Sequence, residues 1–160
     1  MNKSRLAVTI FPVEINGSFA DPLESLRTFD IITDNSIYAF NDVIGIKLSF
    51  KNNLLKDVNI IIDNCGNPAF ILEKKINEIW ERVYISDNFG LPFKFFSDTI
   101  LPSGETYSAE IFIPSNEIRT EKINGIYRLK FNLSEKESSN RLPEKYLYSN
   151  EFIIGEEYEL

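Results

Sequence analysis

Large hydrophobic residues recur at every second position in several segments of this chain, with polar or small residues between them. In the segments 43–50 and 127–133, one set of alternate residues is uniformly large and apolar. Successive side chains of a β-strand point to opposite faces, so this period indicates strands with one buried face. The two apolar faces consist of Ile44, Ile46, Leu48 and Phe50, and of Tyr127, Leu129, Phe131 and Leu133.

Shorter apolar runs predict further strands at 8–15, 29–33, 58–62, 70–74, 79–85, 91–96, 107–113 and 152–154. Asn, Asp, Gly and Pro separate many of them, at spacings typical of an all-β sandwich. Helical signals are limited to single turns at 22–28 and 115–120. We predict an all-β fold, an immunoglobulin-like antiparallel β-sandwich of about seven to nine strands. Residues 1–28 form an N-terminal arm or edge strand, 29–155 the sandwich and 156–160 an acidic tail.

The composition excludes several classes of chemistry. The 160 residues include no histidine and one cysteine, and the net charge is −7. Without histidine there is no Ser-His or Cys-His pair and no His-containing metal site. A single cysteine leaves no intrachain disulfide, and the acidic balance disfavours binding to nucleic acid through its phosphates. We therefore expect no enzymatic activity and name no catalytic, cofactor-binding or metal-binding residue.

The expected location follows from the apolar runs. None approaches the roughly 20 apolar residues that a membrane-spanning helix needs, so no membrane span is expected. As written, the sequence lacks a signal peptide and is expected to be cytoplasmic. If Met1 is an artificial start after a removed signal, the cell envelope becomes the expected compartment. The oligomeric state is left open.

Two loops suggest a surface that binds a protein partner. In an immunoglobulin-like sandwich, the loop after the second strand and the loop before the last strand lie at the same end. The first loop is expected to expose two leucines, and the second is long and carries basic and aromatic residues. Large apolar, Tyr and Arg side chains are typical of interface hot spots. The candidate partner-binding residues are Asn53, Leu54, Leu55, Lys56, Arg141, Leu142 and Tyr146. The alternative is that Leu54 and Leu55 fold back into the core.

Aromatic residues are concentrated between Phe89 and Phe96, with Trp80 and Tyr84 shortly before them. Such a stretch can stack on sugar rings, which would make the chain a carbohydrate-binding module. A platform for nucleic-acid bases would alternate aromatic with basic residues, and only Lys94 serves there. The other interpretation is packing within the sandwich, which gives Trp80 a structural role.

The order of three short motifs carries a family resemblance. A strand ends in Lys51-Asn52-Asn53, a Pro102-Ser103-Gly104 turn precedes another strand, and Gly125-Ile126-Tyr127-Arg128-Leu129 follows. This order resembles bacterial immunoglobulin-like domains of the small envelope-lipoprotein type, over about residues 29–154. In outline it is also similar to bacterial intracellular proteinase inhibitors, which are immunoglobulin-like as well. The resemblance implies a β-sandwich more than it implies an activity.

Tyr127 follows Gly125 at the start of a predicted strand. A tyrosine placed there can form a tyrosine corner, in which its hydroxyl bonds to the backbone a few residues upstream. We predict this structural role for Tyr127 and Gly125. For the whole chain we expect a non-catalytic binding or accessory module that acts through protein–protein contacts. A proteinase inhibitor that presents a loop to a protease and a carbohydrate-binding module are the alternatives.

Overall fold

A computed structural model describes residues 14–15, 18–19, 27–63, 65–86 and 97–156. The described residues form strands joined by turns and two 3-10 turns, η3 (Ser115–Glu117) and η4 (Glu144–Tyr146). None of the helices in this part of the chain has the length and apolar character to cross a membrane. The strands are β1 (Glu14–Ile15), β2 (Ser18–Phe19), β3 (Phe29–Thr33), β4 (Ile37–Ala39), β5 (Val43–Asn52), β6 (Val58–Ile62), β7 (Phe70–Ile76), β8 (Ile79–Ile85), β9 (Ser97–Leu101), β10 (Thr106–Pro114), β11 (Gly125–Phe131), β12 (Leu133–Glu135) and β13 (Phe152–Gly155).

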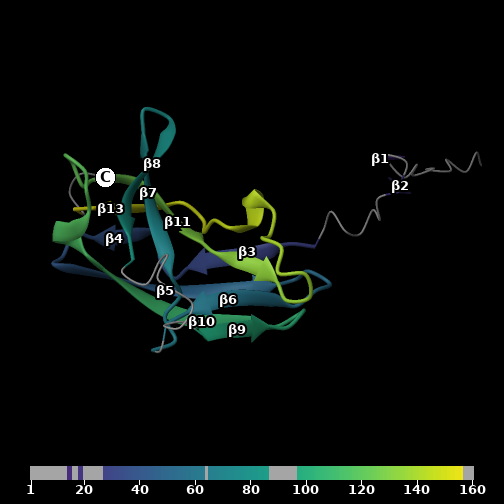
Figure 1. Cartoon of the computed structure of the whole chain (residues 1–160). Helices are drawn as coiled ribbons and strands as arrows, with labels where there is room; N and C mark the ends of the chain where they lie inside the picture. The colour runs from purple at the N-terminus through teal and green to yellow at the C-terminus, as the bar shows by residue number, and fades with distance from the viewer. Residues whose placement is uncertain (1–13, 16–17, 20–26, 64, 87–96, 157–160) are drawn as a thin grey trace, which may run out of the picture.

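The strands from β3 onward form three sheets, which Figure 1 shows as the body of the molecule. One sheet has the order β10-β5-β3, a second has the order β12-β6-β9, and the largest has the order β4-β13-β11-β7-β8. β1 and β2 pair with each other as a separate antiparallel sheet. This arrangement is an all-β sandwich, as the alternation of apolar residues predicts.

Two short segments join the sheets to one another. Residues 131–133 carry the chain directly from β11, which pairs with β7, into β12, which pairs with β6. On the other side of β11, Ser149 forms a parallel bridge with Ile31 of β3, and Tyr148 forms an antiparallel bridge with Lys130. The segment before β13 therefore lies between β3 and β11. It connects the β10-β5-β3 sheet to the five-stranded sheet.

The core contains the apolar faces that the sequence predicts. The fully buried rings of Phe50 on β5 and Phe131 on β11 meet edge-to-face, with centroids 5.0 Å apart. Phe152 on β13 stacks on Tyr127 at 6.3 Å and meets Tyr38 of β4 edge-to-face at 5.5 Å. Aromatic pairs of this kind add to the stabilisation that burial gives. The Phe50–Phe131 contact joins the β10-β5-β3 sheet to the five-stranded sheet, and the other two pairs link strands within the five-stranded sheet.

The strand predictions need two corrections. The described part of the sandwich has eleven strands, β3 to β13, where seven to nine are predicted. The prediction misses strands because β4, β9 and β12 are too short or too polar to show a clear period. β13 and β4 pair in parallel, which departs from the antiparallel prediction. The predicted segments 22–28 and 91–96 lie wholly or largely outside the described residues, and only Glu14–Ile15 of the segment 8–15 is described. The turn expected at 115–120 is present as η3.

The tyrosine corner is confirmed. The hydroxyl of Tyr127, whose side chain is fully buried, donates a hydrogen bond to the carbonyl oxygen of Ile123, four residues upstream. Burial raises the pKa of Tyr127 well above its usual value. Gly125 serves a different purpose from the predicted turn, since it is the first residue of β11 and lies against Lys74. Lys74 is buried and donates to the carbonyl of Lys122 and to the hydroxyl of Thr120.

Candidate functional site

The two loops of the predicted partner-binding surface do meet at one end of the sandwich. The ammonium of Lys56 forms an ion pair with the carboxylate of Glu135, and the backbone N–H of Lys136 donates to the carbonyl of Asp57. The hydrogen bond from Lys56 lowers the pKa of Glu135. Asn53 is tied to β3 through the carbonyl of Thr28. The sequence therefore places these two loops side by side correctly.

Two of the leucines at this end are not available to a partner. Leu54 is only 7% exposed and Leu142 only 2%, which corrects the expectation that they form an exposed apolar centre. The side-chain amide of Asn52 explains the burial of Leu54. It donates to the carbonyls of Lys56 and Leu101, while its oxygen accepts from the N–H of Leu54. These bonds fold the turn so that Leu54 enters the core.

The rest of this end is open to solvent in part. Leu55 is 67% exposed, and Lys56 and Arg141 are exposed as well. Tyr146 is half-buried against the core, and its hydroxyl donates to the carbonyl of Arg27. One exposed leucine with two cations is a smaller apolar surface than the sequence predicts. Whether it binds a partner stays a prediction.

A second surface, which the sequence motifs do not indicate, lies on the outer side of the five-stranded sheet. The alternation that buries Tyr127, Leu129 and Phe131 turns Ile126, Arg128 and Lys130 outward on β11. Neighbouring strands continue this surface, because Ile126 pairs with Ile153 of β13 and Arg128 pairs with Glu73 of β7. Ile153 in turn pairs with Ile37 of β4, so an apolar row runs across three strands. Ile37 and Ile126 are exposed.

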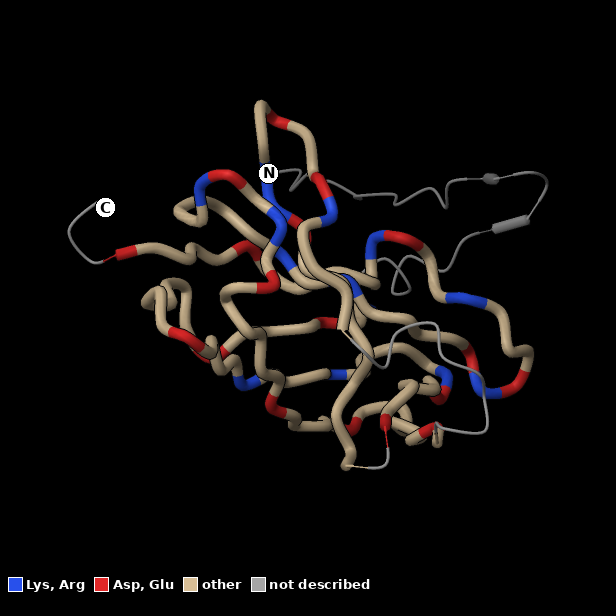
Figure 2. Tube along the Cα trace, turned by 60° about the vertical axis from the view of Figure 1, so that its left-hand side comes forward, with Lys and Arg blue, Asp and Glu red and all other residues tan. Residues whose placement is uncertain are grey.

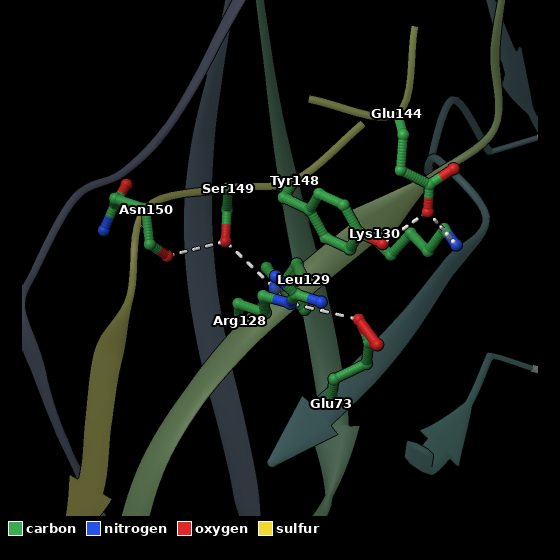
Figure 3. A network of polar contacts seen from close by, with 8 residues as sticks. All are labelled: Glu73, Arg128, Leu129, Lys130, Glu144, Tyr148, Ser149 and Asn150. Atoms are coloured by element: carbon green, nitrogen blue, oxygen red, sulfur yellow. Dashed lines mark hydrogen bonds and ion pairs between the residues drawn. The ribbon is translucent and has the colours of Figure 1, made fainter. Parts of the chain in front are cut away.

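Arg128 is the centre of this surface. Its guanidinium carbon lies 3.7 Å from the ring centroid of Tyr148 and 4.3 Å from that of Trp80. Trp80 reaches it from β8, and Tyr148 from the segment on the opposite side of β11. Its Nε donates to the carboxylate of Glu73 at 3.1 Å, as Figure 3 shows. Stacking on two rings and one ion pair hold the planar guanidinium in a single orientation.

A second ion pair holds Tyr148 in place. Glu144 accepts hydrogen bonds from the Tyr148 hydroxyl at 2.6 Å and from the Lys130 ammonium at 3.0 Å. These two bonds lower the pKa of Glu144. One residue further on, the hydroxyl of Ser149 accepts a hydrogen bond from the N–H of Leu129, which fixes the backbone of this segment against β11 (Figure 3). The ring beside Arg128 is therefore positioned by three bonds.

We call this surface the Arg128 face and define it by Glu73, Trp80, Arg82, Ile126, Arg128, Lys130 and Tyr148. Tryptophan, tyrosine and arginine are the residues most often found at interface hot spots. The signal in the sequence was the polar half of the alternation in 125–131, which separates Arg128 and Lys130 from the core. The aromatic partners could not be predicted, because Trp80 and Tyr148 come from other segments. Trp80 has the expected structural role only in part, since it lies on the surface and contacts Arg128.

Several candidate features fall elsewhere. The aromatic stretch Phe89–Phe96 of the carbohydrate-binding alternative lies outside the described residues. Cys65 is exposed in the turn after β6, where its N–H donates to the carboxylate of Asp63. Figure 2 shows acidic and basic positions interspersed along the described trace. Because the two kinds of charge are mixed along the trace, the electrostatic character of the outer face of the five-stranded sheet depends on which of its charged side chains are paired.

No protein-family model matches this chain, and no curated protein matches it by sequence. Among solved structures, the putative ApaA protein from Bordetella pertussis is 13% identical with a TM-score of 0.47, and the match covers 82% of this chain and 97% of that chain. The CARDB domain of the PF1109 protein from Pyrococcus furiosus, solved in complex with di-metal ions, is 12% identical with a TM-score of 0.37, over 82% of this chain and 96% of that one.

A β-glucosidase from Listeria innocua, solved in complex with glucose, is 13% identical with a TM-score of 0.36. That match covers 81% of this chain but only 16% of the enzyme chain. Similarity this low supports no conclusion about family or activity. The chain is an all-β sandwich domain that fits the expected immunoglobulin-like class in outline, and no specific family is shown. Its function has to be argued from its own residues.

Proposed function

We propose that this chain is a non-catalytic binding module that docks a protein partner on the Arg128 face. The observation that supports this proposal is the guanidinium of Arg128 stacked against Trp80 and Tyr148 beside the exposed side chain of Ile126. A side chain that is already held in position loses little conformational entropy when a partner binds. An arginine between two aromatic rings is therefore well prepared to anchor an interface.

The fold class fits this role. The tyrosine corner at Tyr127 supports relating the chain to the immunoglobulin-like class, in which many cell-surface domains are found. Within the described residues, Glu73, Arg128 and Lys130 of the Arg128 face are engaged in ion pairs or stacking, and none of its charged side chains forms a nucleophile–base pair. Binding therefore explains the arrangement better than catalysis does.

Site-specific photo-crosslinking in an extract of the source cell tests the proposal. One variant carries p-benzoylphenylalanine in place of Ile126, on the Arg128 face. The matched control carries it in place of Phe112, which is 56% exposed on β10 of the opposite sheet. We expect a discrete adduct with one protein from the Ile126 variant only, at a mass set by that partner.

The Arg128→Ala substitution in the Ile126 crosslinking variant should remove that adduct while the melting temperature shows a folded domain. A missing adduct at position 126, or equal adducts at positions 126 and 112, would contradict docking on this face. An adduct from a third variant, with the crosslinker in place of Leu55, would move the binding surface to the loop end that the sequence predicts.

A further inference from the structure

The charges of the Arg128 face are not all balanced. Lys130 is paired with Glu144, and the Nε of Arg128 is paired with Glu73. Beside the face, Lys75 lies over the Trp80 ring and is paired with Glu78. Among the described residues, neither Nη group of Arg128 has a hydrogen-bond partner, and Arg82 has no ion pair. The unsatisfied charges of this surface are thus all cationic, on a chain whose net charge is −7.

Arg82 and the free Nη side of Arg128 lie close together. Arg128 pairs with Glu73 on β7, and Glu73 pairs with Arg82 on β8, so the three residues form one row across three strands. Neighbouring strands are roughly 4.8 Å apart, which places the backbones of Arg82 and Arg128 about 10 Å from each other. Glu73 offsets one of the two positive charges. An approaching anion therefore meets one net positive charge and the free side of a guanidinium.

The orientation of Arg128 selects the shape of that anion. The Nη groups of a guanidinium present parallel N–H donors that match the two oxygens of a carboxylate. Stacking on Trp80 and Tyr148 fixes the plane of the guanidinium, and the Glu73 contact occupies its Nε side. The side chain of Arg128 is 21% exposed, so the remaining donors are accessible from solvent.

The apolar row beside Arg128 adds a second requirement. Ile126, Ile153 and Ile37 lie side by side across β11, β13 and β4 on the same outer surface. A ligand that contacts both this row and Arg128 needs an apolar side chain next to a carboxylate. A protein segment with Glu or Asp beside Leu or Ile has this chemistry.

We infer that the Arg128 face binds an acidic protein segment, with a Glu or Asp carboxylate of that segment gripped by the two Nη groups of Arg128 and a neighbouring apolar side chain on Ile126. This inference rests on the proposed function and specifies the chemistry of the partner. Arg82 contributes attraction at longer range, and Trp80 and Tyr148 act as positioning residues for the guanidinium.

The test uses the full chain and two synthetic hexapeptides, Glu-Glu-Leu-Glu-Glu-Leu and the same peptide with Gln for every Glu. Trp80 is the only tryptophan, so its indole N–H gives one unambiguous NMR signal beside the site. We expect the acidic peptide to shift this signal, the Gln peptide to leave it unchanged, and added salt to weaken binding. We expect Arg128→Lys to reduce the affinity about tenfold, since lysine keeps the positive charge but lacks the two parallel N–H donors of the guanidinium.

Two further variants guard against effects on folding. Arg82→Gln changes an exposed residue and should weaken the acidic peptide several-fold while the melting temperature stays constant. Arg141→Lys, at the loop end, is the matched control and should bind like the wild type. Equal shifts with both peptides would overturn the acidic preference while leaving docking on this face in place. No shift with either peptide, or full affinity in Arg128→Lys, would also overturn the inference, and the crosslinking test would then decide the proposed function separately.

Discussion

Gly125 lies so close to Lys74 that a Cβ atom at position 125 would be 2.7 Å from the Cε atom of the lysine. Lys74 cannot easily move away, because its ammonium is bonded to the Lys122 carbonyl and to the Thr120 hydroxyl. Gly125→Ala should therefore destabilise the domain by about 1–3 kcal/mol through overpacking. Denaturant unfolding measures this loss. Gly45→Ala is the control, since its new Cβ would meet Phe112 at an ordinary 3.5 Å and should cost little.

The tyrosine corner can be tested by removing one oxygen atom. Tyr127→Phe keeps the ring that stacks on Phe152 but leaves the Ile123 carbonyl without its hydrogen bond. We expect a loss of about 1–2 kcal/mol in the free energy of unfolding. Tyr146→Phe provides the comparison, because its hydroxyl bonds to the Arg27 carbonyl at a long 3.2 Å and should cost less. Equal losses in the two variants would show that the corner has no special importance.

Alkaline pH should weaken the fold through Tyr38. Burial, and then the hydrogen bond to Asp34, raise the pKa of Tyr38 to about 12. An unfolded tyrosine ionises near pH 10, so the unfolded state loses this proton first. The contribution of Tyr38 to the free energy of unfolding is fully present below pH 10 and is lost as the pH rises through 12. The total loss is about 2–3 kcal/mol. Unfolding curves across this range should be flatter with pH in Tyr38→Phe than in the wild type.

Glu144 offers a test at acid pH. Hydrogen bonds from Tyr148 and Lys130 lower the pKa of Glu144. The stabilisation from these two bonds is therefore fully present above the ordinary pKa of glutamate, and it is lost as the pH falls through the lowered pKa of Glu144. In Tyr148→Phe one of the two donors is gone, and the pKa of Glu144 should move back toward its usual value. NMR titration of the side-chain carboxyl measures this directly. An unchanged pKa would show that Lys130 alone causes the shift.

The two neighbouring leucines of the loop after β5 should respond differently to the same change. Leu54→Ser should cost about 2–5 kcal/mol of stability, because it removes a buried side chain and leaves a hydroxyl in its place. Leu55→Ser should change stability by less than about 0.5 kcal/mol, since that side chain is already exposed. Similar thermal unfolding of both variants would contradict the different burial of the two leucines.

The strands and the tyrosine corner could be predicted because both depend on patterns within one short segment. The alternation in 127–133 is enough to identify the buried face, and Tyr127 bonds only four residues upstream. Leu54 was misplaced because the bonds that turn it inward come from Asn52 and reach across to Leu101. The sequence shows that Asn52 has a side-chain amide, but it does not show which backbone carbonyls accept hydrogen bonds from that amide in the folded chain.

The Arg128 face escaped prediction for the same reason on a larger scale. Arg128 is recognisable as an outward residue of β11, but an outward arginine is usually a solvated charge. Its importance comes from Trp80, which the pairing of β7, β8 and β11 brings to it, and from Tyr148, which the bridge to Lys130 brings to it. Local sequence shows which face a residue occupies, and the register between strands shows which residues share that face.

The segment that carries Tyr148 and Ser149 lies between β3 and β11 and so belongs to both sheets at once. Contacts between residues this far apart in sequence form slowly, because the chain between them must first be ordered. The stacked guanidinium can exist only once β8, β11 and this segment have come together. A partner that requires it would discriminate between a chain in which these distant segments have assembled and one in which they have not, so that recognition would act as a check on folding.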